Sequence, residues 1–187
     1  MSAVDICNDA LAMVGHEPFI SALDQAGKTA GLCRMFYPRR RDELLRGHPW
    51  NFALKRAEIA ASTDAPVWGP TTLYPLPSDC LRVLRIDGHP LTDWKVEGRA
   101  IACNETAPLN ILYVSQVTDT ALFDASFATA LAARIAVDLA MPLANSAQMR
   151  DALEKAAKDA LREARGMDAQ EGAPEFPSAD VFIEARY

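Results

Sequence analysis

The sequence predicts an α+β fold: an antiparallel helical bundle of about four helices with an inserted small antiparallel β subdomain and an extended C-terminal arm. Three observations lead to this prediction. Apolar residues recur every three or four positions before residue 47 and again after residue 124, which is the period of a helix. Short alternating stretches separated by turn signals lie between these segments. Beyond residue 171, a glycine and two prolines exclude a helix. We therefore divide the chain into residues 1–50, 51–117, 118–170 and 171–187.

Composition places the chain among ordinary globular proteins. Of its 187 residues, 50% are hydrophobic and 24% are charged. A chain of this size buries roughly 70% of its unfolded surface when it folds, so its core needs no disulfide or metal ion for stability. The formal net charge of −6 argues against tight binding of duplex DNA by the general surface, since phosphate contacts need clustered Lys and Arg. A channel through which nucleic acid passes without sticking remains compatible with this charge.

The four cysteines, Cys7, Cys33, Cys80 and Cys103, include no CxxC pair and match no zinc-binding spacing. We expect reduced thiols and an intracellular site of synthesis. The N-terminus has no basic-then-apolar signal sequence, and no uninterrupted apolar run has the length of a bilayer span. The sequence therefore predicts neither a metal site nor a membrane partner.

The first helix is predicted over Ser2–Val14. Ser2 and Asp5 form a capping-box pattern, S-x-x-D, which satisfies free N–H groups at a helix start, and Gly15 stops the helix. Its expected apolar face consists of Ile6, Ala10, Met13 and Val14.

The second helix is predicted from a cap at Asp24 to about Arg46, with a kink or break at Pro38. Three arginines, Arg39–Arg41, follow this proline directly. Consecutive residues point in different directions around a helix, so the arginines do not form a single patch. They indicate a solvated face or, as the alternative, a contact with a partner or with the DNA backbone.

The joint between the helical and β parts is predicted at four residues. Gly47 suits the position just past a helix end, because it lacks a Cβ that would oppose a left-handed backbone. Pro49 prevents the helix from resuming and favours an extended conformation at His48. Trp50 and Phe52 are two residues apart, so on a strand they would share one face. We expect Trp50 to pin the two parts together; that it is simply a buried core residue is compatible with this.

The β part is predicted over about residues 51–114 as four or five short antiparallel strands. Prolines at 66, 70, 75 and 77 make its first half irregular or edge-like. A sheet this small must pack on the helices or on a neighbour. The expected strands and turns are Leu81–Ile86, Asp87-Gly88, Trp94–Val96, Glu97-Gly98, Ala100–Ala102 and Leu109–Val114.

Two further helices follow the β part. The third begins near Asp124, carries an apolar stripe and ends at Pro142, and its many alanines permit close helix packing. Asn145 with Gln148 is expected to cap the fourth helix, whose other face alternates in charge and is therefore solvent-exposed. The stripe of the third helix is Phe127, Leu131, Ile135 and Leu139, and the inward residues of the fourth are Met149, Leu153, Ala157, Ala160, Leu161 and Ala164.

The C-terminal arm, residues 171–187, is unusually apolar for a chain end. We expect it to dock on its own fold, or on another subunit or partner, with plain disorder as the remaining alternative. Its candidate anchors for a partner are Phe176, Val181, Phe182, Ile183 and Tyr187.

No pattern in the sequence supports catalysis or a cofactor. Ala26–Thr29 resembles the end of a phosphate-binding loop, but the required earlier glycine is Ala22 and no buried strand precedes it. The histidines His16, His48 and His89 have no metal-ligand spacing, and there is no G-x-S-x-G elbow. A triad assembled from distant residues is the alternative left open, since such sites leave no local motif.

Several ordered stretches of the sequence resemble the tail tubular protein A family, the head-to-tail adaptors (connectors) of tailed bacteriophages. Each stretch alone is a weak indicator of the family, and the set in this order is more specific. The resemblance covers about residues 1–170. The stretches are Leu44–Ala53, Tyr74–Val83, Phe123–Phe127 with Leu131–Ala136 and Leu139–Leu143, and early in the chain Met13–Gly15 with Ile20–Leu23.

The resemblance implies a non-enzymatic structural protein of the virion that forms a ring, usually dodecameric, at the head–tail junction. Its implied partners are the portal protein, adjacent copies of itself and a downstream tail, nozzle or tail-terminator protein. DNA passes through its channel without sequence-specific binding, and the protein is made in the host bacterial cytoplasm. The chain is short for members from short-tailed phages, which leaves the tail type open. A small protein-binding or scaffolding module that docks through the arm is the competing hypothesis, and a hydrolase is the third.

Overall fold

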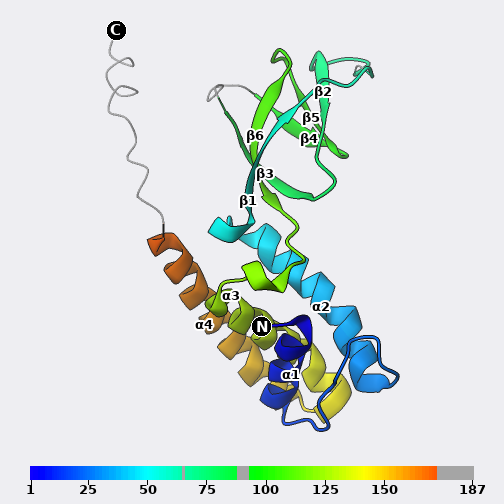
Figure 1. Cartoon of the computed structure of the whole chain (residues 1–187), viewed down its shortest axis with the longest axis vertical. Helices are drawn as coiled ribbons and strands as arrows, with labels where there is room; N and C mark the ends of the chain where they lie inside the picture. Colours follow the sequence, from blue (N-terminus) through cyan, green and yellow to red (C-terminus); the bar gives the residue numbers. More distant parts are fainter. Residues whose placement is uncertain (65, 88–92, 172–187) are drawn as a thin grey trace.

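The computed structural model of the chain describes residues 1–64, 66–87 and 93–171. These residues form an α+β fold, as the sequence predicts, with four α-helices at one end of an elongated molecule and two small antiparallel sheets at the other (Figure 1). We call these the helical part and the β part. The β part is inserted between the second and third helices, so the chain passes from one part to the other twice.

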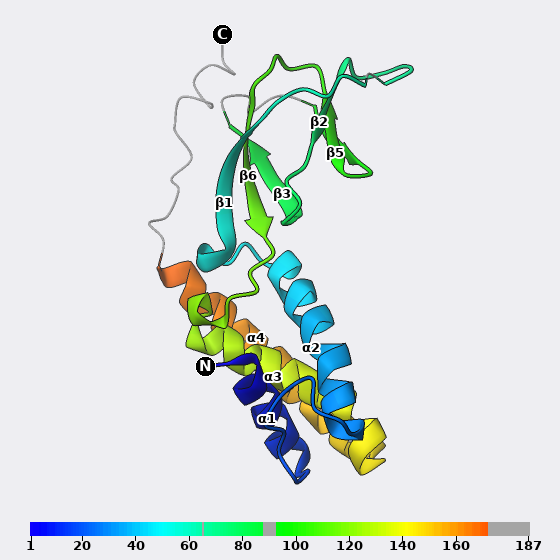
Figure 2. The same ribbon diagram turned by 45° about the vertical axis from the view of Figure 1, so that its right-hand side comes forward.

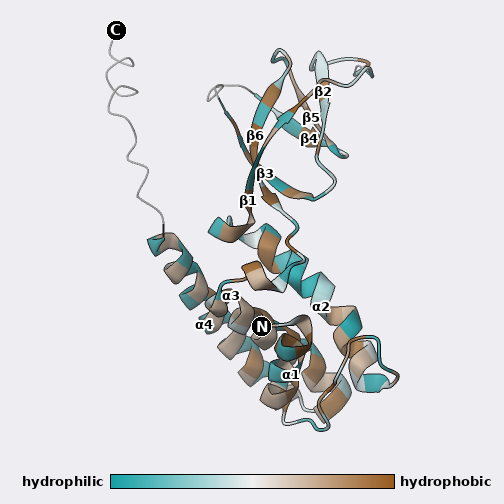
Figure 3. Ribbon diagram, viewed as in Figure 1, coloured by the Kyte–Doolittle hydropathy of each residue, from teal (hydrophilic) through white to brown (hydrophobic). Residues whose placement is uncertain are grey.

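The helical part contains α1 (Ala3–Val14), α2 (Lys28–Gly47), α3 (Ala125–Leu139) and α4 (Ala147–Gln170). Helix α3 contacts each of the other three helices, and ten of its residues are buried (Figure 2). Its alanines let the neighbouring helices approach closely, so the small residues serve packing within this fold. Teal, hydrophilic residues mark α2 and α4 in Figure 3, whereas α3 is largely brown.

The capping predicted for α1 is confirmed. The Asp5 amide donates to the Ser2 hydroxyl at 3.2 Å, and the Ser2 amide donates to the Asp5 carboxylate at 2.7 Å. These hydrogen bonds lower the pKa of Asp5. Gly15 ends the helix with φ 69°. The predicted apolar face is wrong at Met13, which is 40% exposed, because the face turns toward Cys7 and Leu11 instead.

Helix α2 begins later than predicted and is not broken. Gly27, with a φ of 128° that only glycine adopts readily, precedes its first turn, so Asp24 is not the cap. The Gln25 side chain holds the preceding loop by accepting from the Ser21 amide at 2.9 Å. Pro38 lies inside one continuous helix. Burial of α2 residues on both sides of this proline, such as Cys33 and Leu45, offsets its cost of about 3 kcal/mol.

The three consecutive arginines of α2 separate as predicted. Arg39 is exposed, whereas Arg40 binds Asp138 of α3 through two hydrogen bonds of 2.5 and 2.7 Å. Arg41 is buried, pairs with the adjacent Asp42, and lies 5.9 Å from the Tyr37 ring centre. They therefore form no common basic patch.

The β part consists of two three-stranded antiparallel sheets. One has the order β1 (Leu54–Ile59), β6 (Leu109–Ser115) and β3 (Cys80–Ile86). The other has the order β2 (Thr72–Pro75), β5 (Ala100–Cys103) and β4 (Lys95–Glu97). Within the described ranges there are thus six strands rather than four or five.

The predicted turns and strands of the β part can be compared with this topology. The Glu97-Gly98 turn is confirmed, with Gly98 at φ 59° between β4 and β5. The last predicted strand corresponds to β6. Gly88 of the predicted Asp87-Gly88 turn lies outside the described residues. A second, smaller core joins the two sheets around Tyr74, Ile101 and Ile111, all at most 1% exposed.

The third and fourth helices differ from prediction at their junction. Asp124 caps α3 as expected, because its carboxylate accepts from the Ser126 amide at 2.8 Å, which lowers the pKa of Asp124. Beyond Leu139 the chain continues as a π-helix, Ala140–Ala144, which contains Pro142. Asn145 then adopts φ 49°, a conformation that Asn tolerates, so the cap of α4 falls to Ser146 rather than to Asn145.

The segment Ala125–Ala144 has the length and mean hydropathy of a membrane span, although Arg134 and Asp138 interrupt its apolar sequence. Most of it, 61%, is buried inside the protein. Arg134 and Asp138 of this segment form ion pairs with α4 and α2. The apolar composition of α3 thus matches its position at the centre of the bundle.

Candidate functional site at the joint of the two parts

The candidate site residues fall into two groups. Those of the C-terminal arm, Phe176, Val181, Phe182, Ile183 and Tyr187, lie at residues 172–187, outside the described part of the chain. Those of the joint, Gly47, Pro49, Trp50 and Phe52, are all described, and they lie between the end of α2 and the start of β1.

The backbone conformation at the joint differs from the prediction, because more of it is helical. Gly47 is still helical and is the last residue of α2, so the left-handed conformation expected for it is wrong. His48 is extended, as Pro49 requires, with φ −148° and ψ 145°. The next residues, Asn51–Ala53, form a 3-10 helix instead of a strand. Trp50 and Phe52 therefore stack on each other, with ring centroids 6.1 Å apart, rather than sharing a strand face.

Trp50 is the centre of the joint and is fully buried. Its indole N–H donates to the Leu44 carbonyl at 2.9 Å, which satisfies the one polar group of the ring. The Phe127 ring of α3 lies edge-on to it at 4.9 Å, and Phe52 and Phe123 complete the cluster. The aromatic cluster Trp50, Phe52, Phe123 and Phe127 thus ties both crossings of the chain to α3.

Asp168, near the end of α4, is a joint residue that the sequence analysis missed. Its carboxylate accepts from the Asn51 amide at 2.8 Å and lies 2.8 Å from His48 Nε2. The Asn51 side chain donates to the Asp168 carbonyl at 2.7 Å. Asp168 follows Ala157, Leu161 and Ala164 at helical spacing, so an acid on an apolar face was the signal that could have revealed it.

The β part is attached to the helical part through β3 and β6. The guanidinium of Arg46, in the last turn of α2, donates to the Leu81 carbonyl of β3. The Ser115 hydroxyl, at the end of β6, donates to the Ala53 carbonyl at 2.9 Å. The two crossings of the chain therefore lie side by side at the joint.

Hydrogen bonds to the side chain of Asp79 stabilise the first sheet at the end where β1 begins. Its carboxylate accepts from Lys55 Nζ at 2.7 Å and from the Tyr113 hydroxyl at 3.1 Å. The hydrogen bond from Lys55 lowers the pKa of Asp79 below its usual range. Burial and the bond to Asp79 raise the pKa of Tyr113 to about 12.

The described residues hold the ingredients of a catalytic triad only in separate places. His48 meets a carboxylate, Asp168, at the joint, whereas His16 meets a hydroxyl, Thr29, at 3.1 Å near the start of α2. No group of three or more His, Cys, Asp or Glu side chains in these ranges could hold a metal ion. All four cysteines are free and buried, and the hydrogen bond to Cys33 together with burial raises the pKa of Cys7.

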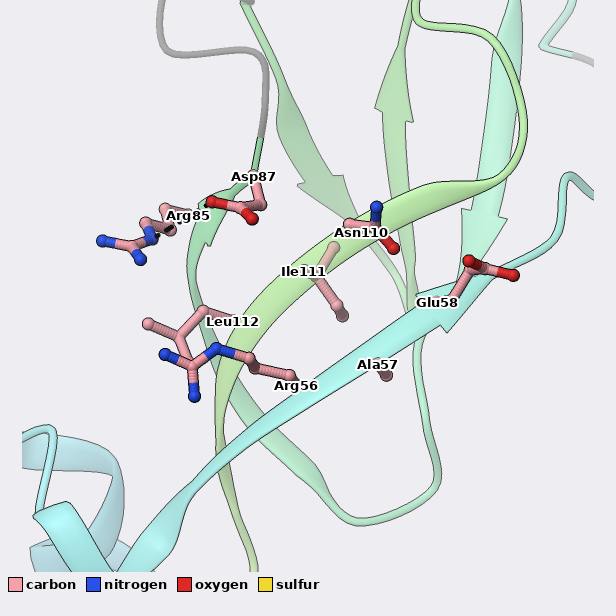
Figure 4. Close-up of a pocket in the computed structure, with 8 residues that line it drawn as sticks. All are labelled: Arg56, Ala57, Glu58, Arg85, Asp87, Asn110, Ile111 and Leu112. Atoms are coloured by element: carbon pink, nitrogen blue, oxygen red, sulfur yellow. Dashed lines mark ion pairs between the residues drawn. The ribbon is translucent and has the colours of Figure 1, made fainter.

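Two surface features of the described residues lie on the β part. Val67 and Trp68, in the loop between β1 and β2, are 99% and 86% exposed. A shallow groove of about 210 Å³ crosses the outer face of the first sheet between Arg56 and Arg85 (Figure 4). It is small for a ligand pocket, which typically encloses about 300 Å³ or more.

Comparison with models of known protein families gives no match. No curated protein matches the chain either.

Proposed function

We propose that this protein is a structural head-to-tail adaptor of a tailed bacteriophage. It forms a ring, of twelve copies, beneath the portal protein, joins the head to a downstream tail, nozzle or tail-terminator protein, and surrounds the channel through which DNA passes. No catalytic activity is part of this function. The proposal rests on the ordered sequence stretches that resemble the adaptor family.

The observation that carries the proposal is that three of those stretches meet at the joint. Leu44–Ala53 and Phe123–Phe127 contribute all the rings of the aromatic cluster. Tyr74–Val83 reaches the same joint, because the carbonyl of Leu81 accepts from Arg46. Segments up to about eighty residues apart in sequence thus build one feature, the connection between a helical and a β part. Three of the ordered stretches thus share one structural feature, which favours the resemblance over chance patterning, whereas Met13–Gly15 and Leu139–Leu143 lie elsewhere in the helical part.

The architecture suits an adaptor physically. A ring subunit needs a heterologous interface on each side, and a head–tail joint needs opposite ends that bind different partners. The elongated molecule offers two different ends, one helical and one built of sheets (Figure 1). The net charge of −6 suits a channel that must not retain a polyanion, since like charge disfavours binding.

The burial pattern narrows where neighbouring copies would make contact. Helix α3 is enclosed by the other helices, so it is unsuited to an interface between subunits. Exposed apolar side chains of the described residues lie instead on both parts and beside the joint. They include Met13, Phe19 and Met35 in the helical part, Val67 and Trp68 in the loop between β1 and β2, and Leu122 and Met167 near the joint.

The deciding experiment is to mix the purified full-length protein with assembled portal and to count subunits in the complex by electron microscopy. A closed ring coaxial with the portal is the expected result. A chain that binds a partner protein as a monomer, without forming a ring on any portal, would replace this proposal with the binding-module hypothesis.

A variant that ends at Glu171 tests the arm separately. We expect it to fold normally and to lose portal binding, because the arm carries the anchors Phe176, Val181, Phe182, Ile183 and Tyr187. A full-length Asp159→Ala variant is the matched control, since it changes an exposed polar side chain of α4 outside the arm and should leave portal binding intact. Unchanged portal binding by the truncated chain would exclude the arm as the portal contact.

A further inference from the structure

Strand β1 has a free edge. It pairs with β6 in unbroken register from Leu54↔Val114 to Ile59↔Leu109, and within the described residues no strand pairs with its other side. It contains neither proline nor a bulge, two of the devices that protect edge strands. Its free backbone groups are therefore a template for another strand.

The outer face of β1 carries an ordered pattern of side chains. Leu54, Arg56 and Glu58 alternate along it, an apolar, a positive and a negative residue, of which Leu54 is partly buried against the helical core while the two charged residues are exposed. Arg56 lies opposite Leu112 of β6, and Arg85 of β3 lies opposite Leu112 on the other side (Figure 4). Neither Arg56 nor Glu58 forms an ion pair with another described residue, so each could pair with an added strand.

The C-terminal arm carries the complementary pattern. Phe182, Glu184 and Arg186 alternate as an apolar, a negative and a positive residue, in the same order along the chain. In a parallel strand they would lie beside Leu54, Arg56 and Glu58, so that both charges on β1 are neutralised. The antiparallel register that keeps Glu184 beside Arg56 would place Arg186 beside Leu54 and Phe182 beside Glu58. The parallel arrangement is therefore the better match.

We propose that residues Phe182–Tyr187 add as a parallel strand to the free edge of β1 in the same molecule. This inference is independent of the proposed function, because it concerns the isolated protein before any partner is bound.

The arm is long enough and starts in the right place. Asp168, three residues before the last described residue, is bonded to Asn51, which is three residues before β1. The eleven residues from Glu171 to Phe182 span up to about 37 Å when extended, whereas three residues cover about 10 Å. The arm and β1 both leave from the joint, which suits a parallel orientation.

The occupant is expected to be the molecule's own arm rather than that of a second copy. A short flexible linker gives an effective concentration in the millimolar range. In purified protein at micromolar concentration, the arm of a second molecule cannot compete with the arm of the same molecule. A neighbour's arm would dominate only if the chain were held in an assembly.

Hydrogen exchange on the full-length protein and on the chain ending at Glu171 tests the proposal. The amides of β1 that do not bond to β6 should exchange about tenfold faster in the truncated chain, because their partner strand is gone. Identical exchange rates of Leu54–Ile59 in the two proteins would overturn the proposal.

A charge swap tests the register. Arg56→Glu and Glu184→Arg should each speed exchange in β1, and the double variant should restore slow exchange. Arg39→Glu combined with Glu184→Arg is the matched control and should not restore it, because Arg39 is an exposed residue of α2 and not of β1. Failure of the Arg56→Glu, Glu184→Arg pair to rescue would overturn the pairing.

A disulfide trap identifies the molecule that supplies the strand. Glu58→Cys with Arg186→Cys, oxidised at micromolar concentration, should give a cross-linked monomer on a non-reducing gel. A cross-linked dimer would show that the arm of a second copy occupies β1 and would overturn the assignment to the same chain.

Discussion

The two parts of the molecule reach stability in different ways. The helical part encloses its central helix on several sides, caps α1, α3 and α4 with side chains, and links its helices by ion pairs such as Arg40–Asp138. The β part has a smaller core, two sheets of only three strands, and an exposed loop that carries Val67 and Trp68.

This difference indicates a division of roles. Small sheets are marginal without support, so the β part depends on the joint, where β3 and β6 meet the end of α2. The core of the helical part is larger and depends less on the sheets, which contribute Val114 to it and pack Leu54, Leu81 and Leu84 against it.

Replacing Trp50 should damage both parts at once. Trp50→Ala removes a fully buried ring from the joint, and large-to-small changes of this kind cost about 3–5 kcal/mol. Urea unfolding followed by circular dichroism measures the loss. Trp68→Ala is the matched control, since that ring is 86% exposed, and it should change the free energy of unfolding by less than about 0.5 kcal/mol. Equal effects of the two variants would refute the central position of Trp50.

Replacing Asp168 should loosen the joint while leaving the cores intact. Asp168→Ala leaves the amide of Asn51 without its partner, which costs about 1–3 kcal/mol. Hydrogen exchange should show faster opening of residues 51–53 and of the last turn of α4, with α1 unchanged. Asp159→Ala, which removes an exposed carboxylate of the same helix, serves as the control. Uniform destabilisation of α1 as well would argue against a local role.

Acid should weaken the β part through Asp79. Because the folded protein lowers the pKa of this carboxyl, the contribution to stability is present above its unfolded pKa, near 4, and is lost as the pH falls through the lower folded value. The difference in free energy of unfolding between wild type and Asp79→Asn should therefore be constant from pH 6 to 8 and shrink below about pH 4. Lys55→Met should reproduce this profile, since Lys55 is the main cause of the shift. A difference independent of pH would contradict the assignment.

The smallest expected effect is a gain in stability at Gly47. This residue is helical, and an added Cβ would meet only Arg165 at an ordinary 3.5 Å, so Gly47→Ala should stabilise the protein by about 0.4–1 kcal/mol. Gly15→Ala is the contrasting control and should destabilise, because Gly15 has φ 69°. Thermal denaturation distinguishes the two. Destabilisation by both substitutions would mean that Gly47 ends α2 in the left-handed form after all.

The sequence predicted well what depends on neighbouring residues. The capping box of Ser2 and Asp5, the cap at Asp124 and the turn at Gly98 are local arrangements, and all three are confirmed. It predicted poorly where two local signals compete. Asp24 and Asn145 are both good capping residues, but Gly27 and Ser146 are better placed for the backbone that the tertiary structure requires.

The joint shows why a candidate site is only partly readable from sequence. The turn after α2 and the burial of Trp50 follow from local chemistry, namely a proline and a large aromatic ring. The 3-10 helix Asn51–Ala53 does not, because it is fixed by Asp168, more than a hundred residues away. An interaction across that separation leaves no local pattern around Asn51.

The hydrogen bond from Ser115 to Ala53 has a consequence for how such a chain can evolve. It brings the first and last residues of the insertion together, so the helical scaffold is interrupted at one point on its surface. Segments with adjacent ends can be exchanged or lengthened without disturbing the host fold. The β part is thus a replaceable module, and a lineage can alter that end of the molecule without redesigning the helices that carry it.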